Sequence, residues 1–488
     1  MNILLSSVGR RSYLVTYFKE AVGKDGKVFV SNSSDISPAF NVADGHVVTP
    51  LIYDDNYIPF LLDYCSKNSI SAIISLFDID LPVLARAKSK FEAIGTEVIV
   101  SEPWVVDICN DKWKSFCFLT EHGIKVPKTF LSLEDAKQAI AQGIINFPIM
   151  IKPRWGMGSI SIFEAENLEE LELLYKKAQR KIFQTYLKFE SKEDAEKCVI
   201  LQEKIDGQEY GLDVINDLEG NYKNTIVKMK YAMRAGETDC AIIEENPTLK
   251  AIGAQLSSLM HHIGNLDVDV FVSPNETYVL EMNARFGGGY PFSHIAGVNL
   301  PQAIVSWLQG KQPDEEIFQA RPNIMVQKDI NLVRIYRDFQ MTLEKTNDFA
   351  LIREAIGKLE HNVYPSLSDR NISLDLYSQK LAKYAEVWIL KGPQDTQEGI
   401  LAGYLNDSET GLAYITYMAI NEKYRGMRVG DRLLSAYLQE AEQKGMRFCK
   451  LEINTENRIG IKFYQSKGFQ ILEKSDHETY YMIKALEK

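Results

Sequence analysis

Residues 279–291 of this chain read V-L-E-M-N-A-R-F-G-G-G-Y-P. Within this largely apolar stretch, Glu281, Asn283 and Arg285 are spaced two residues apart. Because successive side chains of a β-strand point to opposite faces, we expect these three polar groups to share one face of a strand. A solvent-facing strand with a polar face would show the same alternation. The stretch therefore indicates a site only if other parts of the sequence support it.

A second alternating stretch precedes it, L-D-V-D-V-F at residues 266–271. A hairpin turning at residues 274–275 would place Asp269 beside Glu281 and Asn283. Carboxylate and amide oxygens are hard ligands that suit a Mg²⁺ ion sharing nucleotide phosphates. An arginine at the rim of such a site binds phosphate oxygens in a bidentate manner. The two strands together predict a magnesium–phosphate site.

Residues 149–162 read I-M-I-K-P-R-W-G-M-G-S-I-S-I. A Walker phosphate loop carries its lysine after the glycines and opens a helix. Here Lys152 precedes Gly156 and Gly158, and a strand is expected after them. This order favours a glycine flap over a nucleotide, with Lys152 directed at its phosphates. A plain glycine hairpin is the alternative.

Residues 201–214 read L-Q-E-K-I-D-G-Q-E-Y-G-L-D-V, with a strand predicted to end near Glu203. The backbone at Glu203 and Ile205 would suit an adenine edge, which needs one carbonyl acceptor and one N–H donor. Glu209 would accept from ribose hydroxyls. An acidic surface hairpin has the same pattern. Lys112 begins a predicted helix and has no special feature by itself.

The first hundred residues alternate strands and helices. Strands are predicted at 2–7, 28–32, 71–78 and 97–101, with a helix at 11–23 and another before residue 70. This alternation predicts a parallel sheet, whose ligands gather at the carboxyl ends of the strands. Arg10, Asp78 and Asp80 lie at two such ends. The first strand is not followed by G-x-G-x-x-G, which disfavours a nicotinamide dehydrogenase.

Composition narrows the functional class. The formal net charge is -11 and the pI is about 5.4, which disfavours nonspecific binding to nucleic acid or to anionic membranes. The six cysteines are scattered without a C-x-x-C pair, which favours a reduced, cytoplasmic protein. The start of the chain lacks the order of a signal peptide, and no stretch approaches the roughly 18 apolar residues of a membrane span.

In this order, the motifs of residues 1–340 resemble the ATP-grasp enzymes, specifically the branch similar to the large subunit of carbamoyl-phosphate synthase. The resemblance rests on SSVGRR, SPAFNVAD, SLFDID, NDKWK, IKPRWGMGS, QEKIDGQEYGLDV and VLEMNARFGGGYP. It implies a Rossmann-like pre-ATP-grasp domain at 1–105 and an ATP-grasp domain at 106–340. Its departures include the bulky Arg154 and Trp155 before the glycines, and Asp269 where that branch often carries glutamine.

The resemblance implies phosphorylation of a carboxylate by ATP and displacement of the phosphate by an amine. It implies ATP binding by Lys112, Lys152, Gly156, Gly158, Glu203, Ile205 and Glu209, binding of Mg²⁺ or Mn²⁺ by Asp269, Glu281 and Asn283, and stabilisation of the transferred phosphoryl group by Arg285. We expect the acceptor substrate between residues 287–289, His294 and the strand ends carrying Arg10, Asp78 and Asp80. His294 is more readily explained as a structural residue than as a catalytic one.

The last part of the chain carries a second pattern, from a boundary near residue 341. Residues 413–430 run from a strand into the turn Y-R-G-M-R-V-G, which opens a helix. The N–H groups of such a turn and of the helix N-terminus form an anion site suited to a pyrophosphate. Residues 449–469 then predict a strand followed by a helix carrying Tyr464. This region resembles the GNAT-fold acetyltransferases, which take acyl groups from coenzyme A.

This second resemblance implies acetyl-CoA as cosubstrate. It implies contacts to coenzyme A from Arg425, Gly426, Val429, Gly430 and Asn457, and protonation of the departing thiolate by Tyr464. Arg428 stands where the family usually has glycine. Glu452 is a weak choice for the general base, which the sequence does not assign.

The expected fold is therefore α/β in the ATP-grasp part and α+β in a GNAT domain at 341–488. We expect a bifunctional enzyme acting on small-molecule carboxylate and amine substrates, with a homodimer as one assembly to test. Two alternatives remain open at this point. In the first, the chain is a sensor that binds a nucleotide and acyl-CoA without turning them over. In the second, the chain is an active ligase whose GNAT domain is purely structural.

Overall fold

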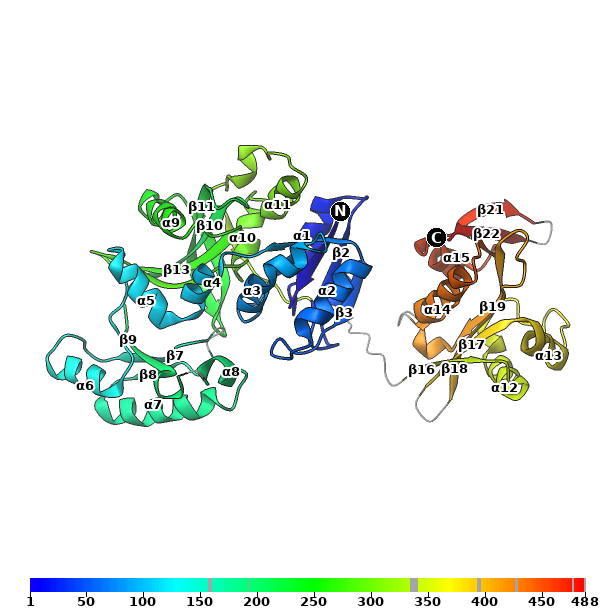
Figure 1. Ribbon diagram of the computed structural model, residues 1–488, viewed down its shortest axis with the longest axis horizontal. Helices are drawn as coiled ribbons and strands as arrows, with labels where there is room; N and C mark the ends of the chain where they lie inside the picture. Colours follow the sequence, from blue (N-terminus) through cyan, green and yellow to red (C-terminus); the bar gives the residue numbers. More distant parts are fainter. Residues whose placement is uncertain are drawn as a thin grey trace. The chain divides into compact units, whose positions relative to one another are not determined.

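The computed structural model describes residues 1–156, 160–192, 194–333, 341–392, 396–425, 429–475 and 478–486. The chain forms two compact units, Met1–Ile335 and Tyr336–Lys488, and each is considered by itself (Figure 1). Two residues predicted to lie in binding sites, Gly158 and Gly426, fall outside the described residues. Over the described ranges, no helix is both long and apolar enough to span a membrane.

The N-terminal unit begins with a five-stranded parallel sheet in the order β3-β2-β1-β4-β5, which confirms the predicted parallel arrangement. Its strands are β1 (Asn2–Ser6), β2 (Lys27–Asn32), β3 (Gly45–Val48), β4 (Ile70–Ser75) and β5 (Glu97–Ile99). Helix α1 (Ser12–Val22) packs on one face, where Ile3 and Leu5 point. Helices α2 (Tyr57–Lys67) and α3 (Asp80–Glu92) pack on the other face against Leu4. Burial on both faces explains why the strands are apolar throughout.

A six-stranded antiparallel sheet carries most of the polar residues discussed below. Its order is β14-β13-β10-β11-β12-β15. The strands are β10 (Gln208–Asn216), β11 (Tyr222–Arg234), β12 (Glu237–Glu244), β13 (Asn265–Val272), β14 (Thr277–Asn283) and β15 (Met325–Gln327). Strands β13 and β14 form the predicted hairpin. One face of the sheet packs against α4 (Pro103–Asn110), α5 (Lys112–Glu121) and α9 (Pro247–Met260), and the polar residues lie on the other face.

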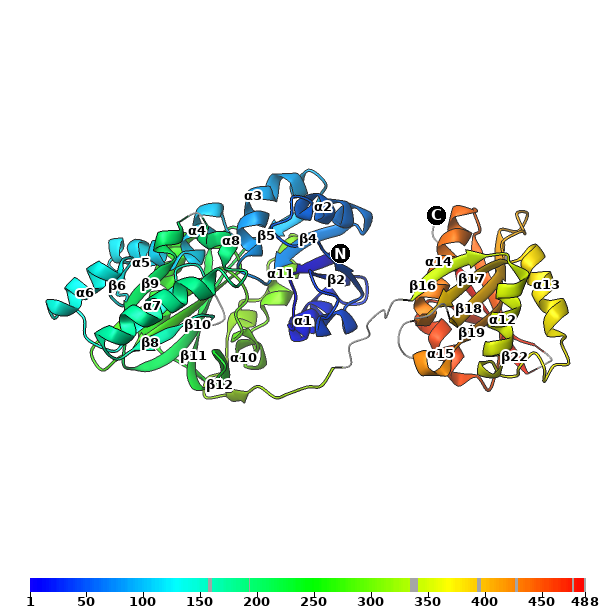
Figure 2. The same cartoon turned by 90° about the horizontal axis from the view of Figure 1, so that it is seen from below.

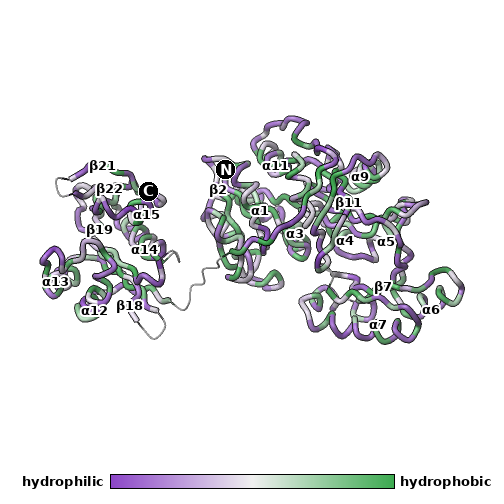
Figure 3. The backbone as a smooth tube through the Cα atoms, turned by 180° about the vertical axis from the view of Figure 1, so that it is seen from behind, coloured by the Kyte–Doolittle hydropathy of each residue, from purple (hydrophilic) through white to green (hydrophobic). Residues whose placement is uncertain are grey.

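A smaller four-stranded sheet, in the order β6-β9-β7-β8, completes this part of the unit. It consists of β6 (Thr129–Phe130), β7 (Ile149–Pro153), β8 (Phe163–Ala165) and β9 (Val199–Glu203), with α6 (Leu133–Ala141), α7 (Leu168–Ile182) and the short α8 (Lys188–Ser191) beside it. Helix α7 carries both hydrophilic and hydrophobic residues (Figure 3), and its buried residues are Leu171, Tyr175, Ala178 and Ile182. The strand predicted after the glycines begins at Phe163, and residues 160–161 before it form a turn.

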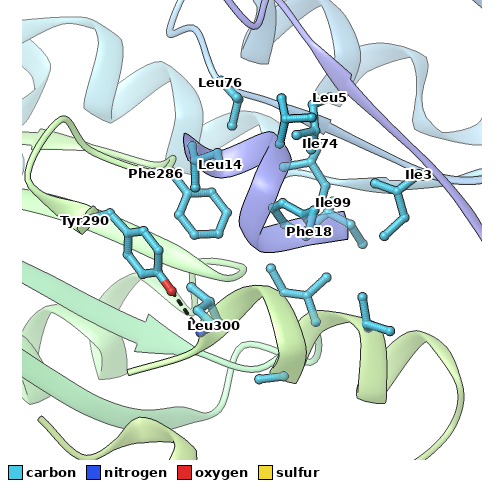
Figure 4. Close-up of a cluster of buried hydrophobic side chains, with 14 of the residues drawn as sticks. Ile3, Leu5, Leu14, Phe18, Ile74, Leu76, Ile99, Phe286, Tyr290 and Leu300 are labelled. Atoms are coloured by element: carbon cyan, nitrogen blue, oxygen red, sulfur yellow. Dashed lines mark hydrogen bonds between the residues drawn. The ribbon is translucent and has the colours of Figure 1, made fainter. Parts of the chain in front are cut away.

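One hydrophobic core joins the parallel sheet to the segment that follows β14 (Figure 4). Phe286 lies edge-on to Phe18 of α1, with ring centroids 6.0 Å apart, and also packs against Tyr290 at 4.8 Å. The Tyr290 hydroxyl accepts a hydrogen bond from the Leu300 backbone N–H at 2.9 Å. Helices α10 (Tyr290–Ile295) and α11 (Leu300–Leu308) follow. This core fixes the glycine segment 287–289 against the carboxyl edge of the parallel sheet.

The C-terminal unit contains a seven-stranded sheet in the order β16-β17-β18-β19-β20-β22-β21. The strands are β16 (Thr342–Thr346), β17 (Glu386–Lys391), β18 (Gln397–Tyr404), β19 (Leu412–Ile420), β20 (Phe448–Asn454), β21 (Gln470–Lys474) and β22 (Thr479–Ala485). One face is covered by α12 (Phe349–Leu359) and α13 (Leu374–Tyr384), and the other by α14 (Val429–Gln443) and α15 (Arg458–Ser466). Figure 2 shows α13 and α14 on opposite sides of the strands.

Candidate active sites

A cavity of about 330 Å³ lies in the N-terminal unit, on the polar face of the six-stranded sheet. Its wall is built from the ends of β4 and β7, the start of α5, and strands β10 to β14. Six of the residues predicted to contact ATP, the metal or the phosphoryl group line it, namely Lys112, Gly156, Asp269, Glu281, Asn283 and Arg285. Residues far apart in the chain therefore meet here.

The register of the β13–β14 hairpin brings the acidic residues together. Asp269 is the cross-strand partner of Glu281, and Asp267 is the partner of Asn283. Cross-strand partners in an antiparallel pair have Cβ atoms about 4.5–5.5 Å apart, so their side chains can reach one ligand. The period of two in both strands places all four side chains on the cavity face.

Two lysines are paired with these carboxylates. The Lys112 Nζ lies 3.1 Å from Glu281 Oε1 and donates to the Gly156 carbonyl at 2.5 Å. The Lys230 Nζ lies 2.7 Å from Asp269 Oδ1 and 2.6 Å from Glu209 Oε1. Lys112 thus connects β14, which carries two of the predicted metal ligands, to Gly156 at the start of the glycine flap.

The charges of this cluster influence one another. Burial raises the pKa of Asp269, and Lys230 opposes that shift. Burial disfavours the charged form of Lys230, but Asp269 and Glu209 outweigh it and raise the Lys230 pKa. The ion pairs with Asp269 and Glu209 therefore hold Lys230 protonated at neutral pH.

The donor set at β13 and β14 fits a hard divalent cation. Asp269, Glu281 and Asn283 supply two carboxylates and an amide, the oxygen ligands that Mg²⁺ accepts. Across the part of the chain that the structure describes, no cluster of three or more His, Cys, Asp or Glu side chains is arranged to hold a metal by itself. Mg²⁺ usually keeps waters and shares substrate phosphates, so an incomplete protein shell suits it.

Lys152 lies at the end of β7 and is almost fully buried. Its Nζ donates to Gln202 Oε1 at 2.7 Å, and Gln202 donates in turn to Thr129 Oγ1 at 3.0 Å. Burial lowers the pKa of Lys152 to about 8, against the attraction of Glu281. A lysine held without a close carboxylate is suited to receive an anionic ligand.

Arg154, which departs from the family pattern, has a structural partner. Its guanidinium binds both oxygens of Asp111 at 2.8 Å, and its Nη1 lies 3.2 Å from Asp194. Asp111 also caps α5 by accepting from the Trp113 and Lys114 backbone N–H groups. The Arg154 carbonyl accepts from the Lys112 N–H at 3.1 Å. This network fixes the position of Lys112 relative to the flap.

Arg285 is held between two carboxylates. Its Nε lies 3.0 Å from Asp78 at the end of the parallel sheet, and its Nη1 lies 2.8 Å from Asp267. Burial disfavours its charge, but the two carboxylates raise its pKa overall. Gly287 is required beside this group, because a Cβ there would lie 2.2 Å from the Asp267 carboxylate.

The residues predicted to bind adenosine lie outside the cavity wall. Glu203, Ile205 and Glu209 are not among the described residues that line it. The Glu203 N–H already donates to the Lys128 carbonyl at 2.9 Å. Of the two residues predicted to meet adenine, Ile205 is thus left to supply the N–H donor.

The expected acceptor region needs two corrections, at Arg10 and at Asp80. Arg10 is exposed, and the neighbouring Arg11 lines the cavity instead. Asp80 is fully buried and accepts from the Tyr57 hydroxyl at 2.8 Å and from three serine hydroxyls, so it stabilises the sheet edge. His294 stacks on Tyr17 with centroids 3.6 Å apart, a packing contact that agrees with the structural role favoured from the sequence. Asp78, by contrast, does line the cavity.

Two lysines of β11 were missed by sequence reasoning. Lys228 and Lys230 both line the cavity. Their signal was present in V-K-M-K at 227–230, where two lysines alternate with apolar residues as Glu281 and Asn283 do. The same period-two argument would have placed both on one face.

In the C-terminal unit, Tyr464 lies where two strands separate. Strands β19 and β20 are parallel and pair only from Leu412 to Ile415 on β19. Beyond that point, the Tyr464 hydroxyl donates to Met418 Sδ at 3.3 Å. Burial raises the pKa of Tyr464, so its hydroxyl stays protonated.

The other residues predicted to bind coenzyme A make contacts within the domain. Arg425 donates to the Asn362 carbonyl at 2.8 Å, and Asn457 caps α15 by accepting from the Gly460 N–H at 2.9 Å. Val429 and Gly430 begin α14, where a Cβ at Gly430 would lie 3.0 Å from Ile420. Glu452 accepts a hydrogen bond from the Thr479 hydroxyl.

Comparison with known families agrees with this arrangement. The sequence matches family models for a PylC-like N-terminal domain over residues 3–99, an ATP-grasp domain over 109–289, and the acetyltransferase (GNAT) family over 366–469. The chain carries an ATP-grasp domain and a GNAT domain. Both resemblances drawn from the sequence are thereby confirmed, and both domains indicate enzymatic activity.

Solved structures resemble the ATP-grasp part. One is the biotin carboxylase domain of 2-oxoglutarate carboxylase from Hydrogenobacter thermophilus, in complex with MgADP, ADP and bicarbonate, at 17% identity, covering 66% of this chain and 73% of that chain with a TM-score of 0.53. Another is biotin carboxylase from Campylobacter jejuni, at 15% identity, covering 65% and 73% with a TM-score of 0.52. At these identities the likeness shows the ATP-grasp fold alone.

Proposed function

We propose that the ATP-grasp part is an ATP- and Mg²⁺-dependent carboxylate–amine ligase that acts on small molecules through an acyl phosphate. We propose that the GNAT domain transfers an acetyl group from acetyl-CoA to an amine. One observation carries the ligase proposal. Each carboxylate predicted to bind the metal is paired with a lysine, Glu281 with Lys112 and Asp269 with Lys230.

This pairing suits a site that exchanges partners when MgATP binds. Asp269, Glu281 and Asn283 would hold the cation, which supplies charge neutralisation and polarises phosphoryl oxygens. Lys112 and Lys230, released from their carboxylates, would then donate to phosphate oxygens. The exchange keeps every buried charge compensated, which a low-dielectric site requires.

The remaining nucleotide contacts follow from position. Lys152, buried without a close carboxylate, would donate to the phosphates beneath the flap that contains Gly156 and Gly158. The Glu203 carbonyl and the Ile205 N–H would meet the adenine edge. Glu209 would bind the ribose hydroxyls once Lys230 has moved to a phosphate.

The reaction then needs positioning rather than a protein nucleophile. A carboxylate oxygen attacks the γ-phosphorus, the bond to the bridging oxygen breaks, and ADP leaves. An amine next attacks the acyl carbon, the C–N bond forms, and phosphate departs while the amine loses a proton. Arg285, held by Asp78 and Asp267, would stabilise the transferred phosphoryl group by exchanging one carboxylate for a phosphoryl oxygen.

In the GNAT domain, an amine nitrogen would attack the thioester carbonyl, the C–S bond would break, and the proton that the nitrogen loses would pass to solvent. Tyr464 would protonate the departing thiolate, consistent with a hydroxyl kept protonated where β19 and β20 separate. The turn around Arg425 and Gly426 and the helix start at Val429 and Gly430 would hold the pyrophosphate. Asn457 would add a contact to the coenzyme.

A second candidate is an active ligase with a structural GNAT domain. The internal hydrogen bonds of Arg425 and Asn457 favour it, because both side chains already have partners. One experiment separates the candidates. The full-length protein is incubated with MgATP, acetyl-CoA and pairs drawn from a panel of carboxylates and amines, and ADP, free thiol and product mass are measured.

We expect ADP release with at least one pair and thiol release with at least one amine. ADP release without thiol release would favour the structural GNAT domain. Nucleotide binding without ADP release for every pair would contradict the ligase and favour a sensor.

A further inference from the structure

Lys228 is a buried lysine that the proposed nucleotide and metal contacts do not use. Its side chain is 2% exposed and forms an ion pair with Asp213, which is fully buried. Asp213 is itself fixed by the Ser293 hydroxyl and by Asn265 Nδ2. Lys228 lines the cavity, whereas Asp213 does not. The counter-ion therefore lies behind the ammonium, and an ammonium has three N–H donors to distribute.

Two glycines leave space on the cavity side of Lys228. A Cβ at Gly289 would lie 3.4 Å from the Lys228 Nζ, in ordinary van der Waals contact, so a longer side chain there would occupy the space beside the ammonium. A Cβ at Gly211 would lie 3.5 Å from the Cε atoms of both Lys228 and Lys230. Glycine at both positions leaves the space beside the Lys228 side chain free of other side chains, and the Nζ itself is buried at this end of the cavity.

The strand register places Lys228 in line with Asp269 and Glu281, the carboxylates proposed to bind the metal. Gly211 is the cross-strand partner of Lys228 on one side and of Asp269 on the other, and Asp269 is paired with Glu281. One row across the sheet therefore runs from Glu281 through Asp269 and Gly211 to Lys228. Neighbouring strands lie about 4.8 Å apart, so Lys228 begins two strand spacings from Asp269.

The counter-ions distinguish Lys228 from three other cations that line the cavity. Lys112 and Lys230 are paired with proposed metal ligands, and Arg285 is paired with Asp78 and Asp267, which also line the cavity. Asp213 is outside the metal donor set, so binding of MgATP would leave the Lys228–Asp213 pair intact. The Lys228 donors that Asp213 does not occupy would then be available to a different anion.

We infer that Lys228 binds the carboxylate substrate of the ligase, donating to the carboxylate oxygen that does not attack phosphorus. This inference rests on the proposed ligase function. In the first step the other oxygen attacks the γ-phosphorus and ADP leaves, and no proton moves to or from Lys228. The ammonium holds the carboxylate beside the Asp269–Glu281 row and stabilises the acyl phosphate oxygen during attack by the amine.

The test compares two variants that both break the ion pair. Asp213→Asn keeps the ammonium and removes its counter-ion. Asp213→Asn combined with Lys228→Met removes both charges and leaves no buried charge unpaired. A purely structural pair would make the two variants behave alike.

The probe is the member of a panel of the twenty amino acids, acetate, succinate and citrate that releases most ADP from the wild-type protein. We expect the double variant to raise the KM for that carboxylate at least thirtyfold, while the affinity for a fluorescent MgADP analogue changes less than threefold. We expect Asp213→Asn to change that KM less than fivefold. An unchanged KM in the double variant, or equal changes in both variants, would overturn the inference.

Two further measurements cover the other outcomes. If the double variant does not fold, Lys228→Arg keeps the charge but moves the donors, and we expect it to raise the carboxylate KM at least tenfold with MgADP affinity retained; an unchanged KM would overturn the inference. If no panel member releases ADP, the proposed ligase function fails for these carboxylates. Carboxylate-dependent thermal stabilisation with MgADP then decides: a shift in wild type that the double variant loses supports Lys228, and any other result contradicts it.

Discussion

The ligase cavity and the GNAT domain use their predicted residues differently. In the cavity, Lys112, Lys230 and Arg285 are paired with carboxylates that also line the cavity, so a ligand can exchange partners with them. In the GNAT domain, Arg425 and Asn457 are bonded to backbone groups that maintain the fold. Ion pairs in a cavity indicate a site prepared for a charged ligand. Contacts to the backbone indicate residues that would have to maintain the fold and bind coenzyme A at the same time.

The largest effect should come from removing metal ligands. Glu281→Gln combined with Asn283→Ala should lower ADP release by roughly three orders of magnitude, because a metal supplies several kcal/mol of charge stabilisation. Thiol release from acetyl-CoA should not change. Glu276→Gln is the matched control, since it removes a carboxylate just before β14 that binds Lys125 outside the cavity. Full ADP release by the double variant would remove the metal assignment.

In the GNAT domain, Tyr464→Phe should lower acetyl transfer by about 10²-fold, the lower range for loss of a general acid. ADP release should stay at the wild-type rate. Tyr437→Phe is the control, because it removes another buried hydroxyl, which donates to the Tyr404 carbonyl at 3.2 Å. The measurement is thiol release with acetyl-CoA. If Tyr464→Phe transfers acetyl groups as fast as wild type, Tyr464 is not the general acid. If neither protein transfers acetyl groups, the domain is structural.

Lys152 should make nucleotide binding depend on pH. Its pKa is lowered to about 8 by burial, so the charged form is complete below that pH and is lost above it. Affinity for MgADP should therefore fall above pH 8, by up to about tenfold per pH unit. Lys152→Met should remove the dependence. A flat wild-type profile, measured with a fluorescent ADP analogue from pH 7 to 9.5, would contradict the lowered pKa.

The same shift affects folding with a defined sign. The ordinary pKa of 10.5 exceeds the folded value, so between pH 8 and 10.5 the unfolded chain binds more protons at this residue than the folded chain. Lys152 therefore opposes folding most below pH 8, and its penalty decreases as the pH rises. Lys152→Met should stabilise the protein more at pH 7 than at pH 10.

The smallest effect concerns the double use of Asn457. Asn457→Ala should destabilise the C-terminal unit by about 1 kcal/mol through loss of the helix cap. Asn457→Ser should restore stability, because serine also caps helices. If Asn457 contacts coenzyme A, the serine variant should still bind acetyl-CoA several-fold more weakly than wild type. If Asn457→Ser binds acetyl-CoA as tightly as wild type, the only role of Asn457 is to cap helix α15.

Periodicity carried most of the prediction of the ligase site. Glu281, Asn283 and Asp269 were placed on one face because strand side chains alternate, and the hairpin register agrees. The ion partners were not predictable, because Lys112 and Glu281 are 169 residues apart and no local pattern links them. The exchange of Arg10 for Arg11 has the same origin, since a loop has no periodicity to decide which neighbour points inward.

The sequence also does not show which polar groups are buried and satisfied inside the fold. Asp80 follows a strand end just as Asp78 does, yet it is enclosed by hydroxyls from Ser6, Tyr57 and Ser75. These partners come from three separate elements, so only the folded arrangement shows that Asp80 is satisfied internally. Lys228 and Lys230 were predictable by alternation, but two lysines in a strand are also typical of a solvent-facing edge.

The central claim is that a carboxylate is activated as an acyl phosphate in the cavity. The most direct test supplies a carboxylate labelled with ¹⁸O in both oxygens, together with MgATP and an amine, and determines the mass of the released phosphate. The account predicts phosphate carrying one ¹⁸O atom, because one carboxylate oxygen is transferred to phosphorus before the amine displaces it. Product formation with unlabelled phosphate would contradict it.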